Sequence, residues 1–176
     1  MSDQIYNSLI GRVVQVNKSG PGATVGKLLA VKEDFLVFRA KNQEIIFFTL
    51  EHIKTITEET EAQIHFSSEE KELLYPNNFQ KLIQTFIGEN VRINRSGPDS
   101  RVGKLHGEDG SFIMLQTERD GLIFYTIEHL KSLSIVVMQS NEENEVSDNS
   151  DEESPVEETI DMASESENET ENDKEN

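Results

Sequence analysis

The apolar residues of this chain change from a helical to a strand period, and the same change occurs twice. A run near residue 80 has the i, i+3, i+4, i+7 spacing of one helical face, and a weaker run of this kind opens the chain. We predict two short amphipathic helices, each ending at a glycine, Gly11 or Gly88, that can adopt the left-handed conformation. Asn77 or Asn78 can cap the first amides of the second helix. The residues of the two faces are Ile5, Tyr6, Leu9 and Ile10, then Phe79, Leu82, Ile83, Phe86 and Ile87.

After each helix, apolar and polar positions alternate, which is typical of half-buried strands. The first copy predicts a strand with Val14 and Val16, a second from Gly26, a third with Leu36 and Phe38, a fourth over 45–50 and a last with Ile53 and Ile56. In the second copy, strands contain Val91 and Ile93, Ile113 and Leu115, residues 122–127, and Leu130 and Leu133. Asn42–Gln43 and Asp120–Gly121 predict tight turns before the fourth strands.

The two copies superimpose without a gap when the sequence is shifted by 77 positions. Seventeen of the 46 positions from Gly11 to Ile56 are then identical, and most others exchange similar residues. A shared Ser-Gly-Pro turn consists of Ser19, Gly20 and Pro21 and of Ser96, Gly97 and Pro98. A shared closing motif, Glu-His-x-Lys, consists of Glu51, His52 and Lys54 and of Glu128, His129 and Lys131. The chain therefore carries one module twice.

A helix followed by about five short antiparallel strands predicts an all-β protein, a tandem duplication of a small Sm-like or SH3-like barrel. We expect a first module over 1–57, an acidic linker over 58–75 with one candidate strand at 63–66, a second module over 76–138 and a tail over 139–176. A single barrel of this size buries only about 60% of its unfolded surface. The two modules are therefore expected to pack together or to oligomerise.

The charge of the chain is concentrated in its tail. Residues 139–176 hold sixteen acidic residues and one lysine, so they carry −15 of the formal net charge of −18. Such a segment is predicted to be disordered, because it cannot bury enough apolar surface to offset its chain entropy. Either it only solvates the protein, or it is a substrate for acid-directed kinases. The serines that lie beside carboxylates are Ser147, Ser150, Ser154, Ser164 and Ser166.

No residue pattern in the chain predicts an enzyme, a cofactor or a metal site. Cysteine is absent, which excludes disulfides and thiolate metal sites. His52 and His129 lack a spaced second ligand, and each lies between charges one residue before an apolar position, so we expect them to face outward. The segment from Gly20 to Lys27 lacks the spacing and the hydroxyl residue of a phosphate-binding loop.

Membrane and nucleic acid are not expected as partners. No secretory signal and no apolar run of about 20 residues is present. The acidic tail would also repel anionic polymers. Single-stranded RNA binding remains an alternative, because small barrels often bind RNA and Arg92, Arg95, Arg101 and Lys104 cluster near the second turn.

The repeated Ser-Gly-Pro, Gly-Lys-Leu and Glu-His-x-Lys motifs resemble those of spore coat protein B of endospore-forming bacilli, over roughly residues 5–135. The resemblance implies a non-enzymatic structural component of the spore coat, made in the mother-cell cytoplasm and deposited on the forespore. It implies other spore coat proteins as partners and a coat kinase that acts on a C-terminal segment. Self-association into a homo-oligomer is compatible with the same role. The expected docking surface is the helix face with whichever strand edge stays unpaired.

Overall fold

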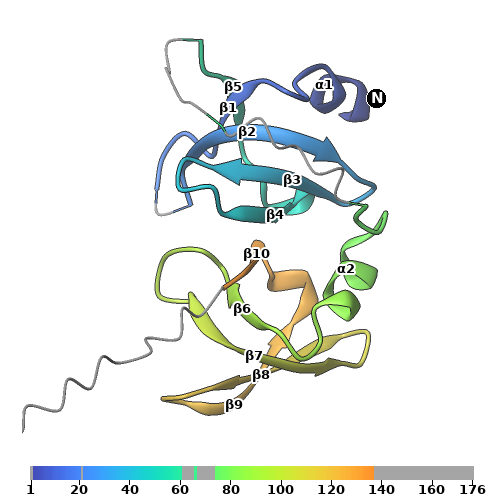
Figure 1. The fold of residues 1–176 in the computed structure, drawn as a ribbon, viewed down its shortest axis with the longest axis vertical. Helices are drawn as coiled ribbons and strands as arrows, with labels where there is room; N and C mark the ends of the chain where they lie inside the picture. Colours follow the sequence, from blue (N-terminus) through green and yellow to red (C-terminus); the bar gives the residue numbers. More distant parts are fainter. Residues whose placement is uncertain (1, 21, 61–65, 67–73, 137–176) are drawn as a thin grey trace, which may run out of the picture. The chain divides into compact units, whose positions relative to one another are not determined.

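The computed structural model describes residues 2–20, 22–60, 66 and 74–136, and Met1–Ser140 form one compact unit. The tail with its five serines, Pro21 and most of the linker, including residues 63–65 of the candidate strand, lie outside the described residues. The described part is mainly antiparallel sheet with two short helices (Figure 1), so the prediction of an all-β protein is confirmed.

Among the described residues, each module contains one helix, five strands and one 3-10 turn in the same order. The first module consists of α1 (Ser2–Ser8), β1 (Val13–Val16), β2 (Thr24–Val31), β3 (Phe35–Ala40), β4 (Ile45–Thr49), η1 (Leu50–His52) and β5 (Ile56–Glu58). The second consists of α2 (Phe79–Thr85), β6 (Asn90–Ile93), β7 (Arg101–Glu108), β8 (Phe112–Thr117), β9 (Gly121–Thr126), η2 (Ile127–His129) and β10 (Ser132–Ile135).

The predicted helix cap and the left-handed glycines are confirmed, whereas the helices end earlier than predicted, at Ser8 and Thr85. Asn78 caps α2, its side-chain oxygen accepting a hydrogen bond from the amide of Lys81 at 2.9 Å. Gly11 and Gly88 follow the two helices with φ of +83° and +94°, in the left-handed region that glycine adopts without steric cost. These glycines reverse the chain into β1 and β6.

The prediction that Ile53 and Leu130 lie in the last strands was wrong. Each residue instead follows a 3-10 turn, in which its amide donates to the carbonyl three residues earlier, Leu50 or Ile127, at 3.2 and 3.0 Å. The last strands begin only at Ile56 and Ser132. The tight turn is needed because the chain must pass from the fourth strand of its module to the far side of the first.

The ten strands form one continuous antiparallel sheet in the order β5-β1-β2-β3-β4-β10-β6-β7-β8-β9. Each module contributes five neighbouring strands in the same internal order, and the modules are joined by β4 and β10. There Phe48 faces Ser132, Phe47 faces Leu133 and Ile46 faces Ser134. The last strand of the second module thus pairs with the fourth strand of the first.

The sheet bends at the same place in both modules. The register between β2 and β3 shifts at Leu29, and the register between β7 and β8 shifts at His106, the position related to Leu29 by the repeat. Gly26 and Gly103, of the Gly-Lys-Leu motif, lie just before these bulges. A Cβ atom on Gly103 would meet the backbone oxygen of Gln116, and one on Gly26 would meet that of Arg39. The motif therefore needs glycine for the close approach of neighbouring strands.

The apolar core is divided unequally between the modules. One cluster belongs to the first module alone and includes Val14, Leu28, Leu36 and Phe38. The other cluster contains the core of the second module together with three residues of the first, Phe35, Val37 and Phe47. Strand β3 is consequently buried on both faces, whereas β8, its counterpart, alternates between buried positions and positions that are exposed or partly buried. The second module covers a face of the first, and the described residues leave the equivalent face of the second uncovered.

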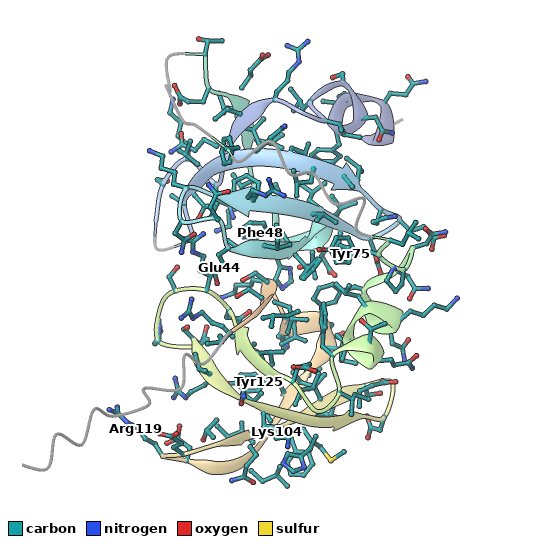
Figure 2. The ribbon with its side chains drawn as sticks, in the orientation of Figure 1. Glu44, Phe48, Tyr75, Lys104, Arg119 and Tyr125 are labelled. Carbon is teal, nitrogen blue, oxygen red and sulfur yellow. The ribbon has the colours of Figure 1, made fainter. Side chains whose placement is uncertain are left out.

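Aromatic side chains dominate the contact between the modules. The ring of Phe47 lies 4.9 Å from Tyr75, 5.4 Å from Phe86 and 6.1 Å from Phe35 between centroids. Burial raises the pKa of Tyr75, although the nearby Arg39 acts in the opposite direction. Figure 2 shows Tyr75 and Phe48 where the modules meet. Because the linker residue Tyr75 packs on the first module, the chain is fixed to both modules at this point.

A partly buried ion pair adds to this contact. Glu44, before β4, accepts a hydrogen bond from Arg92 of β6 at 3.1 Å and from the hydroxyl of Ser134 at 2.6 Å. The side chain of Glu44 is only 12% exposed. Its carboxylate is compensated by both donors, which fixes the register of β4 against β10.

Candidate functional site: the cleft between the two modules

The Ser-Gly-Pro turn and the closing motif of each module are held together by one asparagine. Asn17 and Asn94 directly follow β1 and β6, with φ of +55° and +49°. Their side-chain oxygens accept hydrogen bonds from the backbone amides of Lys54 and Lys131, at 2.9 and 2.8 Å. Asparagine tolerates the left-handed region better than other residues with a side chain. The two asparagines therefore fix the last residue of each closing motif against the turn.

Backbone contacts complete the same junction in both modules. The amide of Asn17 donates to the carbonyl of Thr55 at 2.9 Å, and the amide of Asn94 donates to that of Ser132 at the same distance. The backbone amide of the next residue donates to the side-chain hydroxyl of the same partner, from Lys18 to Thr55 and from Arg95 to Ser132, both at 3.0 Å. The repeated motifs thus share an architectural role.

A cleft of about 450 Å³ lies where the two junctions meet. The first module lines it with its turn, with Phe48 and with its closing motif, and the second module lines it with residues of its own turn and closing motif. The lining residues are Asn17, Ser19, Gly20, Gly22, Phe48, Glu51, His52, Lys54, Asn94, Arg95, Ser96, Lys131 and Ser132. Pairing of β4 with β10 creates the cleft, because it brings these segments together.

The cleft contains more basic than acidic side chains. Arg95, Lys54 and Lys131 line it, and Glu51 is the carboxylate among the lining residues. Lys131 forms an exposed ion pair with Asp99 at 3.2 Å. The Nη1 atom of Arg95 is buried, and within the described part of the chain it has no hydrogen-bond partner. A buried guanidinium nitrogen of this kind can donate to a phosphate or carboxylate oxygen.

The structure brings together part of the predicted site residues and separates the others. Ser19, Gly20 and Ser96 of the turns and Glu51, His52, Lys54 and Lys131 of the closing motifs line the cleft. Gly97, Pro98, Glu128 and His129 do not. His129 is 77% exposed and lies 3.9 Å from Glu128, whereas His52 is half-buried in the cleft wall. The two histidines therefore have different surroundings despite their equivalent positions.

The four basic residues near the second turn do not form one patch. Arg92 pairs with Glu44 at the contact between the modules, and Arg101 pairs with Asp120 at 3.0 Å. Arg101 and Lys104 line a separate, open hollow on the second module, while Arg95 points to the cleft. Only Arg95 of these four lines the cleft.

Asn17 and Asn94 were not singled out from the sequence alone. Both are identical between the copies and immediately precede the turn, and asparagine is a residue that adopts positive φ. Those two signals together would have indicated their role.

The described residues contain no group of three or more His, Asp or Glu side chains placed to hold a metal ion. Within that same part of the chain, no helix has the length and apolar character to cross a membrane. The cleft itself offers the buried Nη1 of Arg95 and the charges of Lys54 and Lys131 to a bound anion.

Comparison with known proteins identifies two relatives, both from Bacillus subtilis (strain 168). The chain is 36% identical to spore coat protein B over 128 residues, which cover 73% of this chain and 33% of that protein. It is 24% identical to the uncharacterized protein YwrJ over 136 residues, 73% of this chain and 60% of that protein. No family model matches the chain.

The aligned part thus spans about a third of the length of spore coat protein B, and no more than 60% of either relative. The length and identity of the first match agree with the resemblance predicted from the repeated motifs, which is thereby confirmed. The chain is therefore similar to spore coat protein B over 73% of its own length.

Proposed function

We propose that this chain is a non-enzymatic structural component of the bacterial endospore coat, made in the mother cell and deposited on the forespore. The observation that carries the proposal is its 36% identity to spore coat protein B. In this proposal the two modules are small Sm-like or SH3-like barrels that bind other coat proteins. The acidic tail projects from them and accepts phosphate from a coat kinase.

The use of the repeated residues supports a structural role. Asn17, Asn94, Gly26 and Gly103 serve backbone geometry, and the amides of Lys54 and Lys131 are used as donors to the asparagines. An enzyme needs a nucleophile, base or metal held in a preorganised cleft. The shared motifs instead position strands and turns, which is what a building unit requires.

The barrel interpretation rests on strand order and bending. Five strands follow each other in the order last-first-second-third-fourth in both modules, with a bulge in the second strand. Bulges increase the local twist and bend a short sheet on itself.

Fractionation of purified spores tests the proposal. An antibody against the chain should detect it in the coat extract and label intact spores, and spores of a strain without the gene serve as the control. Mass spectrometry of the same extract should find phosphate on the tail serines. Recovery of the chain from the mother-cell lysate alone would refute the coat role.

The cleft supports one alternative, a module that binds single-stranded RNA. Its specific support is the buried Nη1 of Arg95, which has no hydrogen-bond partner among the described residues and lies beside Lys54 and Lys131. Fluorescence anisotropy with a short oligonucleotide at low salt tests it. Arg95→Ala should then abolish binding, while Arg119→Ala, in the separate hollow, should not. Absence of binding by the unsubstituted chain at low salt would remove this alternative.

A further inference from the structure

The two free ends of the sheet carry complementary surfaces. Strands β5 and β9 are its edges, and within the described residues each pairs with a single neighbour, β1 or β8. By the repeat of 77 residues, β9 is the counterpart of β4 and β5 is the counterpart of β10. Strands β4 and β10 pair with each other inside the chain. One edge of the sheet, β9, is therefore the counterpart of β4, and the other edge, β5, is the counterpart of the strand that pairs with β4.

The face beside β9 is apolar and exposed. Phe124 is 59% exposed, whereas its counterpart Phe47 is 1% exposed between the modules. Phe112 is 41% exposed, whereas its counterpart Phe35 is fully buried. Leu122, at the start of the same strand, is 48% exposed. Large exposed apolar side chains gathered on one face mark an interaction site.

The opposite end of the sheet carries the counterparts of the residues that cover Phe35 and Phe47 inside the chain. In the second module, Leu82, Ile83, Leu130 and Leu133 belong to the cluster that also contains Phe35 and Phe47 of the first module. Their counterparts in the first module, Ile5, Tyr6, Ile53 and Ile56, line a hollow of about 290 Å³ between α1 and β5. Ile5 is 64% exposed, although its counterpart Leu82 is fully buried.

We propose that these two ends bind each other in successive copies of this chain, in a head-to-tail assembly that repeats the contact between the modules. Strand β9 of one copy adds to β5 of the next, and Phe124 and Phe112 enter the hollow beside α1. The internal register predicts that Tyr125 faces Thr55, Phe124 faces Ile56 and Ile123 faces Thr57 of the next copy. Such a heterologous contact closes into a ring or continues as a filament, depending on the rotation per step.

Some internal contacts are retained by this assembly and some are not. Thr49 donates from its hydroxyl to the carbonyl of Leu130 at 2.8 Å, and its counterpart Thr126 is also a threonine. The pair of Glu44 and Arg92 is lost, because the residues at the equivalent positions are Gly121 and Gln15. The contact between copies is therefore weaker than the internal one and depends on chain concentration.

Sedimentation velocity of the full chain over a range of concentrations tests the proposal. The unsubstituted chain should form species larger than one chain, more so at higher salt, which screens repulsion between the acidic tails. Phe124→Glu and Ile5→Glu should each abolish them. The matched control is Ile87→Glu, because Ile87 and its counterpart Ile10 are both exposed, at 45% and 43%, and so lie outside the internal contact.

Mixing the two deficient variants tests direction. Phe124→Glu keeps an intact α1–β5 end and Ile5→Glu keeps an intact β9 end, so an equimolar mixture should form a species of two chains and nothing larger. A mixture that sediments as single chains would refute head-to-tail binding. Circular dichroism spectra matching those of the unsubstituted chain show that each variant is folded.

The absence of cysteine allows the register to be tested directly. Thr57→Cys with Ile123→Cys in one chain should give a ladder of disulfide-linked species on mild oxidation. Thr57→Cys with Leu122→Cys should not, because neighbouring residues of a strand point to opposite faces. Equal ladders would refute the register, and single chains at all concentrations would refute the assembly.

This inference deepens the assembly part of the proposed coat function, and the two fail separately. A chain that self-associates but is absent from spore coat extracts refutes only the coat role. A chain that is present in the coat but remains single in solution at all concentrations refutes only the head-to-tail contact.

Discussion

Substitution of Phe47 and of its repeat counterpart Phe124 by alanine compares one side chain in two surroundings. Phe47 is 1% exposed and packs against Tyr75, Phe86 and Phe35, whereas Phe124 is 59% exposed. Truncation of a buried phenylalanine costs about 3–5 kcal/mol, because it combines the lost transfer free energy with a cavity. Truncation at an exposed position changes stability by about 0.5 kcal/mol or less. We therefore expect Phe47→Ala to lower the free energy of unfolding by several kcal/mol and Phe124→Ala to leave it almost unchanged.

Urea denaturation followed by far-ultraviolet circular dichroism measures both values, since the chain has no tryptophan to report unfolding. With a slope of about 2 kcal/mol per M, a loss of about 4 kcal/mol lowers the midpoint by about 2 M. The experiment is done at a chain concentration where sedimentation shows single chains, so that contact between copies does not protect Phe124. Equal midpoint shifts in the two variants would refute the unequal burial of the modules.

Three further predictions concern the repeated architecture. Gly103→Ala should destabilise the chain by about 1–3 kcal/mol in the same urea assay, because its Cβ would overlap the backbone of Gln116, while Gly22→Ala, whose nearest atom is 3.7 Å away, should not. Asn94→Ala should cost about 0.5–1.5 kcal/mol, because the buried Asn94 side chain no longer accepts the hydrogen bond from the amide of Lys131, and similar melting of the variant and the unsubstituted chain would contradict this. Hydrogen bonds, first from Gln84 and then from Gly110, lower the pKa of Glu108 below its ordinary value. The ionised Glu108 therefore stabilises the folded chain above that ordinary value, and this stabilisation is lost as the pH falls through the lowered pKa. Thermal melts should therefore separate the unsubstituted chain from Glu108→Gln near neutral pH and converge in acid.

The local structure was predictable because it depends on residues close in sequence. Asn78 as a helix cap, the left-handed conformation of Gly88 and the alternation of Val91 and Ile93 were all expected and all confirmed. The 3-10 turn before Ile53 was missed, because the sequence predicts one strand that contains both apolar residues, Ile53 and Ile56. Such a turn is required only by the path of the chain between two distant strands, which the local pattern does not contain.

The pairing of β4 with β10 could not be read from the repeat, because the repeat makes both modules look alike. Two equivalent fourth strands and two equivalent last strands allow several pairings, and the sequence pattern is similar for each. The cleft with Arg95 and His52 follows from that pairing, so it was equally out of reach. The repeat indicates which segments are alike, and the neighbours of each segment are decided by packing between modules.

The apolar run Phe-Leu-Val-Phe of β3 resembles the run Phe-Ile-Met-Leu of β8, and each predicts a half-buried strand. Only β3 is buried on both faces, because α2 of the second module covers its outer face. Phe112 and Phe124 remain exposed on the described surface. Exposed apolar side chains lower solubility unless they bind a partner. A third α-helix to cover them does not exist among the described residues, but α1 of a second copy has its own apolar face exposed through Ile5. The similar sequences of β3 and β8 and their unequal burial are thus explained if the contact between the modules is repeated between copies of the chain.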